Sequence, residues 1–351
     1  MNNKLEYGYA LCYDDVLIKP EFSTVASRSE VDTTTYVGCK ISIPVIGSNM
    51  DSVVDEKMAK LLVENGAQAC LPRFMSVEDN VTLFKQLENS SPFVSVGIKD
   101  GEFERLTALY NVGARKVFVE VAHAANSAVA DFFVKAKSTY PACWFSVGTF
   151  GTSGEVIRFN KYLCERNSLY PDAYIVGVGG GSACKTRIET GCGYPMLQTI
   201  LDVKAACPSV KIIASGGHKN TGDIAKALAA GADAVMIGQM FARTLEAPGR
   251  VVHIGGKAFK EYAGSASLPQ YEKQGKVSSF RTPEGVVCEF PWESLKSLRE
   301  VLDNINGGLR SAFSYVGAKD LYEFQNKAKF VIVTTNSLIE SKPHGLGKNN
   351  V

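Results

Sequence analysis

Short apolar segments rich in valine and isoleucine recur along the chain, and each is followed by polar residues and then by a segment with helical spacing of its apolar positions. This alternation predicts strands separated by helices. Eight strands are expected, at residues 43–47, 67–71, 93–98, 116–122, 143–148, 173–178, 211–215 and 234–238. Helices are expected between them, among others at residues 55–65, 76–89, 127–140, 154–167, 195–207 and 221–230, with Ser76 and Asn220 or Thr221 as N-caps.

Eight such units predict an α/β fold, a closed (β/α)8 TIM barrel, because strands that are apolar throughout need both faces buried. A doubly wound open sheet is the rival fold, but no GxGxxG motif follows the first strand. We expect a single barrel domain over residues 1–351. Residues 251–292, a long stretch after the last strand, are expected to form a mobile active-site excursion.

Composition and charge narrow the function. The 351 residues are 45% hydrophobic, with 38 basic and 36 acidic side chains and no long run of either sign, so neither nucleic acid nor a membrane surface is an expected partner. The first residues lack the apolar core of a signal peptide, and a cytoplasmic location is expected. The nine cysteines form no CxxC pair, which favours reduced thiols over disulfides or structural zinc.

Glycine and polar residues follow most of the predicted strands, at the end where barrel enzymes carry their active sites. These candidate turns are residues 48–52, 120–123, 179–187, 215–218 and 238–239. Glycine lacks the Cβ atom that keeps a ligand away from the backbone, so the loop at residues 179–186 suits a phosphate, although a flexible turn is the alternative. Its carbonyl oxygens also suit a monovalent cation. Glycines 216, 217 and 238 occupy the usual phosphate position of a barrel, with simple packing as the alternative.

Cys184 is a candidate nucleophile, because Lys185 and Arg187 lie nearby in the sequence and positive charge favours the reactive thiolate. An inert cysteine is the alternative. Thr186 either positions a proton or caps a helix. Glu284 acts as an acid or base if the excursion folds over the site, and is otherwise a solvated surface residue.

Four motifs together resemble one family, the IMP dehydrogenase and GMP reductase superfamily. They are YDDVLIKP at residues 13–20, SNMDSV at 48–53, GGGSACKT at 179–186 and GGLRSA at 307–312, in the family's order and spread over nearly the whole chain. The resemblance implies a (β/α)8 barrel, usually a homotetramer. It also implies that Cys184 bonds to C2 of a purine nucleoside monophosphate while a nicotinamide cofactor exchanges hydride at that carbon.

The resemblance assigns roles to further residues. Cys184, Thr186 and Glu284 would be catalytic, and the carbonyls of Gly179, Gly181 and Cys184 would hold potassium. The cofactor NADPH would lie against Glu120, Val121, Ala122 and Arg73. The nucleotide would contact Ser48, Met50, Ser182, Ser215, Gly216, Gly217, Gly238, Gln239, Tyr262, Ser265, Ser267 and Arg281.

Within this family the sequence is more similar to the reductases. No insertion the size of a regulatory (CBS) module follows the second strand, and residues 186–195, Tyr194 above all, resemble the reductase pattern. Val121 and Ala122 do so too. Residues 262–284 lack the Arg-Tyr pair with which a dehydrogenase activates water. The resemblance therefore implies NADPH-dependent conversion of GMP to IMP and ammonia, through a thioimidate at Cys184, although residues 283–286 are somewhat dehydrogenase-like.

Several positions depart from the family pattern. Ser215 stands where an aspartate normally binds both ribose hydroxyls, and a serine discriminates less against a sugar that lacks one of them. The hypothesis that follows is a 2′-deoxynucleotide substrate such as dGMP. Thr149, Gln239, Ser265 and Ala266 also differ from the usual residues.

Three other functions remain open on the sequence. One is an IMP dehydrogenase without regulatory modules, which would make XMP with NAD. Another is a purine-nucleotide-binding protein that has lost catalysis, against which the joint presence of Cys184, Thr186 and Glu284 argues. The last is a phosphate-binding barrel with a different reaction.

Overall fold

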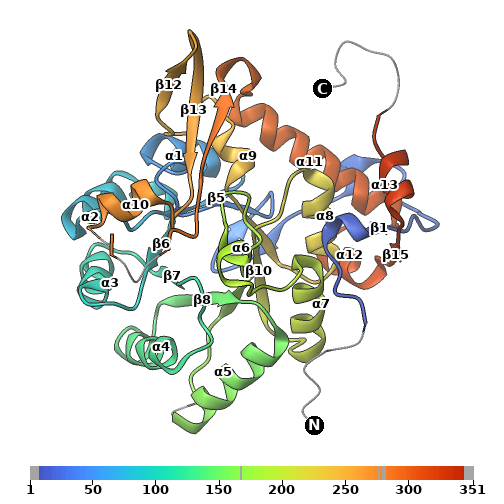
Figure 1. Cartoon of the computed structure of the whole chain (residues 1–351). Helices are drawn as coiled ribbons and strands as arrows, with labels where there is room; N and C mark the ends of the chain where they lie inside the picture. Colours follow the sequence, from blue (N-terminus) through green and yellow to red (C-terminus); the bar gives the residue numbers. More distant parts are fainter. Residues whose placement is uncertain (1–7, 167, 276, 279–281, 344–351) are drawn as a thin grey trace.

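Eight parallel strands close into a barrel at the centre of the chain (Figure 1). The computed structural model describes residues 8–166, 168–275, 277–278 and 282–343. Around the barrel the strand order is β10-β11-β4-β5-β6-β7-β8-β9. The strands are β4 Val45–Gly47, β5 Gln68–Leu71, β6 Phe93–Val96, β7 Lys116–Glu120, β8 Trp144–Phe150, β9 Ala173–Val176, β10 Lys211–Ser215 and β11 Ala234–Ile237. All eight predicted strands, and the (β/α)8 fold class, are confirmed.

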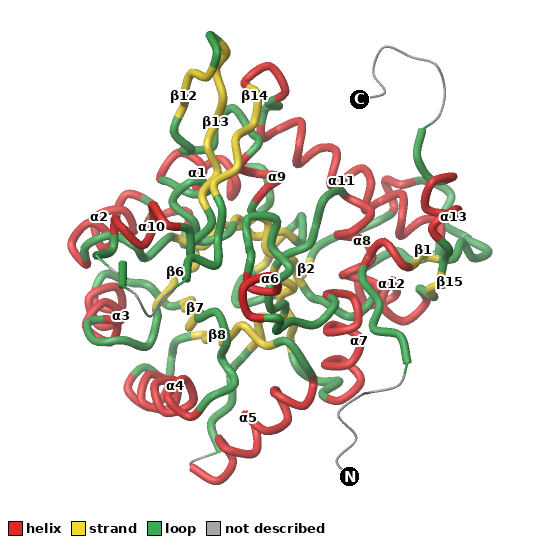
Figure 2. Tube along the Cα trace, in the orientation of Figure 1, coloured by secondary structure: helices red, strands yellow, loops and turns green. Residues whose placement is uncertain are grey.

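Helices surround the barrel, as the red and yellow tubes of Figure 2 show. The two predicted N-caps are confirmed: Ser76 accepts a hydrogen bond from the amide of Asp79, and Asn220 accepts one from the amide of Asp223. The outer helices are α1 Glu56–Glu64, α2 Val77–Gln86, α3 Glu102–Asn111, α4 Ser127–Thr139, α5 Ser153–Arg166, α7 Met196–Ala206 and α8 Thr221–Ala229. Two short helices, α6 Thr186–Thr190 and α9 Gln239–Ala242, follow strands β9 and β11.

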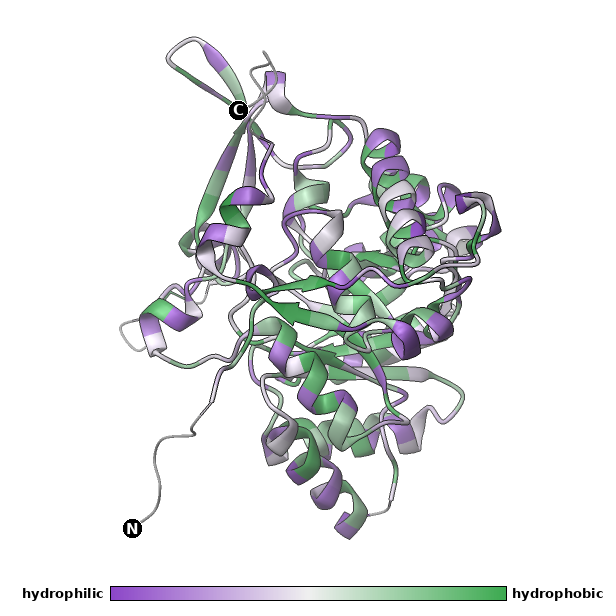
Figure 3. Ribbon diagram, turned by 90° about the vertical axis from the view of Figure 1, so that its right-hand side faces the viewer, coloured by the Kyte–Doolittle hydropathy of each residue, from purple (hydrophilic) through white to green (hydrophobic). Residues whose placement is uncertain are grey.

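The interior of the barrel is apolar and closed at its amino-terminal end. Phe93 and Phe118 pack at the centre of an inner cluster with ring centroids 4.7 Å apart, and both are fully buried. A hairpin of β2 Thr35–Tyr36 and β3 Lys40–Ile41 adds Val37 and Ile41 to this cluster. In Figure 3 the hydrophobic colour follows the central strands, and the hydrophilic colour lies mostly on outer helices and loops. The mouth at the carboxyl ends is therefore the polar end of the barrel.

The two ends of the chain meet beside the barrel. Strand β1, Val16–Ile18, pairs antiparallel with β15, Phe330–Ile332. The C-terminal helices are α11 Leu298–Tyr315, α12 Leu321–Lys327 and α13 Thr335–Glu340, and short 3-10 helices occupy Tyr13–Asp15, Arg28–Glu30, Glu88–Ser90 and Trp292–Ser294. In the part of the chain described here, no helix has both the length and the apolar character needed to cross a bilayer.

Residues 251–292, the excursion, form a three-stranded antiparallel sheet that projects from the barrel at the top of Figure 1. Its strands are β12 Val251–Ile254, β13 Lys257–Ala263 and β14 Val287–Pro291, and helix α10, Leu268–Lys273, lies between β13 and β14. Asp51, in the loop after β4, accepts hydrogen bonds from Gln270 at 2.8 Å and Lys273 at 2.7 Å. Side-chain contacts therefore tie α10 to the mouth of the barrel.

Candidate active site

A hydrogen-bond relay joins the three residues for which the sequence suggests catalysis. Cys184 lies in the loop between β9 and α6, and its thiol donates to the hydroxyl of Thr186 at 3.1 Å. That hydroxyl donates in turn to the carboxylate of Glu284, across a distance of 2.6 Å. Because Glu284 is 98 residues further along the chain, only folding of the excursion onto the barrel brings the third member into place.

Backbone hydrogen bonds hold Glu284 in this position. The amide of Lys185 donates to the carbonyl of Glu284 at 2.6 Å, and the amide of Val286 donates to the carbonyl of Ala183 at 3.0 Å. Cys184 and Gly285 thus form an antiparallel bridge. A Cβ atom on Gly285 would lie 2.8 Å from the amide nitrogen of Ser267, so a side chain at residue 285 would push the backbones of residues 285 and 267 apart. The backbone, rather than side-chain packing, sets the distance between the thiol and the carboxylate.

The two cations near Cys184 in the sequence are engaged by other groups. Lys185 forms an ion pair with Glu189 at 2.6 Å. Arg187 donates to the carbonyl of Val178, at 3.0 and 3.2 Å from its two nitrogens, and also to the carbonyl of Tyr194. The hydrogen bond of the thiol is therefore with Thr186, and not with either of these two cations.

The expected phosphate residues come together from four segments. A Cβ atom on Gly238, after β11, would lie 2.6 Å from the hydroxyl of Tyr262 on β13 and 3.7 Å from the sulfur of Met50 after β4. The hydroxyl of Tyr262 also interacts with Ser182, in the loop after β9. Tyr262 is buried, and burial raises its pKa to about 12, so the phenol stays a hydrogen-bond donor at neutral pH.

Gly216 and Gly217 pack against the glycine loop after β9. A Cβ atom on Gly216 would lie 2.9 Å from the backbone of Gly180 and of Gly181, and both Gly216 and Gly217 have positive φ, +102° and +83°. Packing therefore requires glycine at Gly216, as the alternative interpretation proposed. Within the described residues the N–H groups of Gly216 and Gly217 make no hydrogen bond, so they remain available to an anion at the mouth.

The other expected nucleotide residues are spread around this mouth. Ser48 joins β4 to β11 through its amide, which donates to Ile237 at 3.0 Å, and Gln239 is the first residue of α9. The hydroxyl of Ser215 donates to the sulfur of Met236 at 3.6 Å. Ser265 is exposed, whereas Ser267 is 1% exposed at the start of α10. Arg281 lies outside the described residues.

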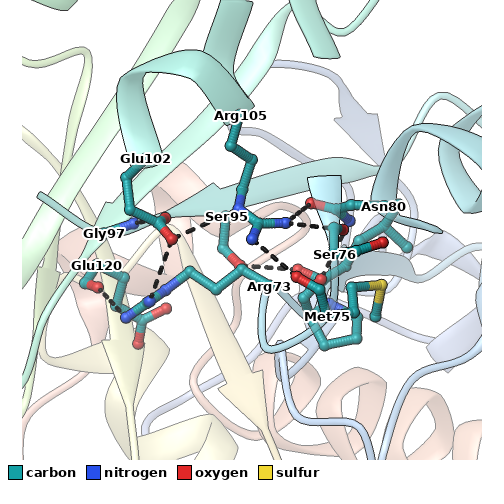
Figure 4. Close-up of polar contacts among 11 residues, drawn as sticks. Arg73, Met75, Ser76, Asn80, Ser95, Gly97, Glu102, Arg105 and Glu120 are labelled. Atoms are coloured by element: carbon teal, nitrogen blue, oxygen red, sulfur yellow. Dashed lines mark hydrogen bonds and ion pairs between the residues drawn. The ribbon is translucent and has the colours of Figure 1, made fainter. Parts of the chain in front are cut away.

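Charged residues cluster where β5, β6 and β7 end, on the expected cofactor side (Figure 4). Arg73 donates to the carbonyl of Glu120 at 3.3 Å and lies 4.0 Å from the carboxylate of Glu102. Glu102 also accepts the amide of Gly97 at 2.5 Å and pairs with Arg105 at 3.4 Å. The guanidinium of Arg73 is thus held across the ends of three strands. Val121 and Ala122 follow directly after Glu120.

Glu120 is a half-buried acid within this cluster. Its carboxylate accepts a hydrogen bond from Asn49 at 2.8 Å. Burial raises the pKa of Glu120, while the nearby Arg73 and the hydrogen bond from Asn49 act in the opposite direction. From the sequence, Asn49 was assigned no role, although it lies within the motif at residues 48–53, because its partner Glu120 is on another strand. Glu102 was not named at all, because no motif marks this residue.

The residues expected to hold potassium only partly match that task. The carbonyl of Gly181 accepts the amide of Cys184 at 3.0 Å, and the Cγ of Arg187 would lie 2.7 Å from a Cβ atom on Gly179. A guanidinium fixed beside this turn repels a second cation. We therefore derive no step of the chemistry through potassium.

Two histidines in the turns after barrel strands β7 and β10 differ in environment. His123 is exposed and lies 3.3 Å from Glu155. His218 is buried behind the turn of Gly216 and Gly217, and its Nε2 lies 3.1 Å from the hydroxyl of Tyr13. Burial lowers the pKa of His218 to about 3, so this imidazole is neutral at physiological pH.

The chain is similar to known proteins over nearly its whole length. The family model described as "IMP dehydrogenase / GMP reductase domain" matches residues 10–344. Proteins named GMP reductase from Vibrio atlanticus (strain LGP32) and from Aliivibrio salmonicida (strain LFI1238) are each 32% identical over 344 residues, which cover 94% of this chain and 96% of the relative. The GMP reductase of Vibrio parahaemolyticus serotype O3:K6 (strain RIMD 2210633) is 31% identical over 345 residues, with the same coverage. With a family model across the barrel and excursion and relatives that match over nearly their whole length, the chain belongs to the IMP dehydrogenase and GMP reductase family.

Proposed function

We propose that this chain is a GMP reductase-like enzyme, an NADPH-dependent oxidoreductase that converts a guanine nucleoside monophosphate to the hypoxanthine nucleotide and ammonia. The observation that carries the proposal is the relay from Cys184 through Thr186 to Glu284, at 3.1 and 2.6 Å. A thiol with a built-in proton acceptor suits covalent attack on a ring carbon. The relatives named GMP reductase support the same reaction.

The relay accounts for both proton movements. As the sulfur of Cys184 attacks C2 of the guanine ring, the thiol proton passes through the hydroxyl of Thr186 to the carboxylate of Glu284. Glu284 returns that proton by the same route to the 2-amino group, which leaves as ammonia, and C2 stays bonded to sulfur. The nicotinamide cofactor, when bound, supplies hydride to C2. The C2–S bond then breaks, and Cys184 leaves as the thiolate that solvent can reprotonate.

Other residues orient the reactants in this proposal. The phenol of Tyr262, the hydroxyl of Ser182 and the N–H groups of Gly216 and Gly217 bind the phosphate, since all are donors near one point of the mouth. The cluster around Arg73 and Glu120 fits a dinucleotide, because it offers a cation and a half-buried carboxyl group at neighbouring strand ends. The excursion closes over the nucleotide as a mobile part of a single catalytic domain.

The sugar of the nucleotide is a separate question, which Ser215 raises. A serine has no carboxylate to pair with both ribose hydroxyls, and the hydroxyl of Ser215 already donates to the sulfur of Met236 at 3.6 Å. We propose that the enzyme accepts dGMP at least as well as GMP. A dehydrogenase that makes XMP from IMP with NAD is the second candidate, and only the dehydrogenase-like sequence of residues 283–286 favours it. We expect the working form to be a homotetramer in the cytoplasm. Sedimentation of the purified protein tests the tetramer.

One assay separates these reactions. Purified protein is mixed with NADPH and either GMP or dGMP, and absorbance at 340 nm is followed while released ammonia is measured. Oxidation of NADPH with an equal amount of ammonia is the expected result, and a strong preference for GMP would contradict the dGMP proposal. If neither nucleotide causes NADPH oxidation but NADH forms from IMP and NAD, the enzyme is a dehydrogenase and not a reductase. If no combination gives a reaction, the protein binds a nucleotide without catalysis.

A further inference from the structure

One buried lysine joins the excursion to the barrel through the backbone. Lys260, on β13, is 2% exposed. Its ammonium group donates to the carbonyls of Thr244 at 2.9 Å, Leu245 at 3.0 Å and Ala247 at 2.8 Å. A lysine ammonium has three hydrogens, so all of its donors are used and none is left for a ligand. Lys260 therefore acts on other parts of the protein rather than on a substrate.

The three carbonyls lie on the segment that leads away from the phosphate region. Gly238 is the N-cap of α9 and Arg243 is its C-cap, so residues 244–247 begin just after that helix. The same segment is fixed on its other side, because the amide of Leu245 donates to Lys296 at 2.9 Å and Glu246 accepts the amide of Leu298 at 2.8 Å. Lys260 thus hydrogen-bonds to residues 244–247, a segment that also hydrogen-bonds to Lys296 and to Leu298 at the start of α11.

The strand that carries Lys260 also carries Tyr262. Side chains two residues apart on a strand point to the same face, and both of these are buried. Phe290, on the neighbouring strand β14, pairs with Lys260 across the ladder, and its ring stacks on that of Tyr262 with centroids 6.2 Å apart. From this face the hydroxyl of Tyr262 reaches the vacant Cβ position of Gly238 at 2.6 Å. A shift of β13 would move this hydroxyl and the Lys260 ammonium together.

The contact between β13 and the barrel segment leaves little room for an alternative register. A Cβ atom on Gly249 would lie 2.1 Å from the carbonyl oxygen of Glu261 and 3.1 Å from the side chain of Lys260. The backbones therefore touch at this point. Replacing Lys260 by an apolar residue would leave the carbonyls of Leu245 and Ala247 without this donor, whereas the carbonyl of Thr244 would keep the amide of Ala247 at 3.4 Å. A buried carbonyl that loses its donor is costly.

We propose that Lys260 is a positioning residue for the phosphate of the nucleotide. Its ammonium group binds the carbonyls of residues 244, 245 and 247 and thereby fixes the position of β13 on the barrel. This places the hydroxyl of Tyr262 next to Gly238. The inference rests on the proposed function, because it assigns the Tyr262 hydroxyl to the substrate phosphate. It adds a residue that determines affinity for that phosphate without touching it.

The test compares a nucleotide with the nucleoside that lacks its phosphate. Dissociation constants for GMP and guanosine are measured by calorimetry on wild-type protein, K260M, Y262F, the double variant and K257M, whose lysine is exposed at the start of the same strand. We expect K260M to weaken GMP binding about tenfold or more, as loss of a well-placed donor does, and to leave guanosine binding unchanged. The double variant should bind GMP no more weakly than Y262F, and K257M should match the wild type.

Other outcomes would overturn the inference. Equal weakening of GMP and guanosine would show general loosening of the fold, and losses that add in the double variant would show that Lys260 and Tyr262 act independently. If K260M does not fold, G249A is the second variant, because its methyl group would meet the backbone of Glu261 and the side chain of Lys260 on the same strand. It should give the same selective loss, and unchanged GMP affinity in G249A contradicts the proposal. A wild-type protein that prefers GMP over guanosine but oxidises no NADPH would refute the proposed reaction and leave the role of Lys260 standing.

Discussion

At the scale of single residues, Cys184 is the group on which the proposed chemistry depends. We expect C184A to lower kcat by about a thousandfold or more, because the covalent route is lost, and to change the dissociation constant for GMP by less than about threefold. C192A is the matched control, since Cys192 is exposed and outside the relay. The assay is NADPH oxidation with each variant, together with calorimetry of GMP binding. Activity of C184A near that of the wild type would rule out the thioimidate.

His218 gives the stability of the protein a pH dependence. In the unfolded chain its pKa is near the ordinary value of about 6.5, and in the native protein burial lowers it to about 3. As pH falls from about 6.5 to about 3, the unfolded state binds a proton that the native state does not, so stability is lost over this window at up to about 1.4 kcal/mol per pH unit. Above about pH 6.5 this residue contributes no slope.

Urea unfolding of wild type and H218N at pH 7.5 and pH 5 measures that effect. Because asparagine does not titrate, the free energy of unfolding should fall more steeply toward pH 5 in the wild type than in H218N. The comparison uses slopes, since loss of the contact between His218 and Tyr13 shifts the absolute stability of H218N at both pH values. Parallel slopes would mean that the imidazole is accessible to protons in the native state.

Sequence and structure agree unevenly at this scale. Cys184, Thr186 and Glu284 are brought into one relay, as the motifs suggest, although no spacing in the sequence shows that Glu284 reaches Thr186. Lys185 and Arg187 are neighbours of Cys184 in sequence, but the contacts of their side chains are with Glu189 and with the carbonyls of Val178 and Tyr194. These contacts were not predictable from the sequence, since side-chain direction is set only by the folded loop.

At the scale of elements, α10 is held to the barrel through one carboxylate. Asp51 accepts hydrogen bonds from Gln270 and Lys273, and the loop that carries Asp51 also carries Met50 at the phosphate region. Replacing Asp51 by asparagine removes the ion pair, and we expect kcat/KM to fall about threefold to tenfold because a partly buried charged hydrogen bond contributes about 1 kcal/mol. Amide hydrogen exchange over α10 should increase in the same variant.

D303N serves as the control for that variant. It breaks an exposed ion pair, Arg299 with Asp303 at 3.2 Å, within α11. Exposed pairs of this kind contribute little, so kcat/KM and exchange over α10 should remain those of the wild type. Equal effects of D51N and D303N would show that loss of any surface charge, rather than release of α10, lowers the activity.

Elements were predictable where their pattern is local. All eight barrel strands follow from runs of apolar residues, whereas β1 and β15 are three residues each and pair across more than three hundred positions of sequence. The pair of Gly307 and Gly308 lies inside helix α11, where two glycines are not expected. A Cβ atom on Gly308 would lie 2.5 Å from Thr221, so close packing of α11 on α8 requires glycine there.

At the scale of the whole molecule, stability and chemistry reside at opposite ends of the barrel. Phe93 begins β6 and packs on Phe118 and Trp144, with ring centroids 4.7 and 5.6 Å away. Truncation to F93A should lower the free energy of unfolding by about 3–5 kcal/mol, because it opens a cavity in a fully buried cluster. Urea unfolding measures this loss. The KM for GMP should not change, and a several-fold change would show that the two ends are coupled.

The position of Glu284 in the chain has a consequence for protein synthesis. Strand β11 ends at Ile237, so every strand of the barrel is synthesised before the excursion that carries Glu284. A nascent chain of that length already contains Cys184 and Thr186 but lacks the carboxylate that accepts the hydrogen bond of Thr186 in the folded protein. The relay can therefore be completed only after all eight barrel strands have been synthesised.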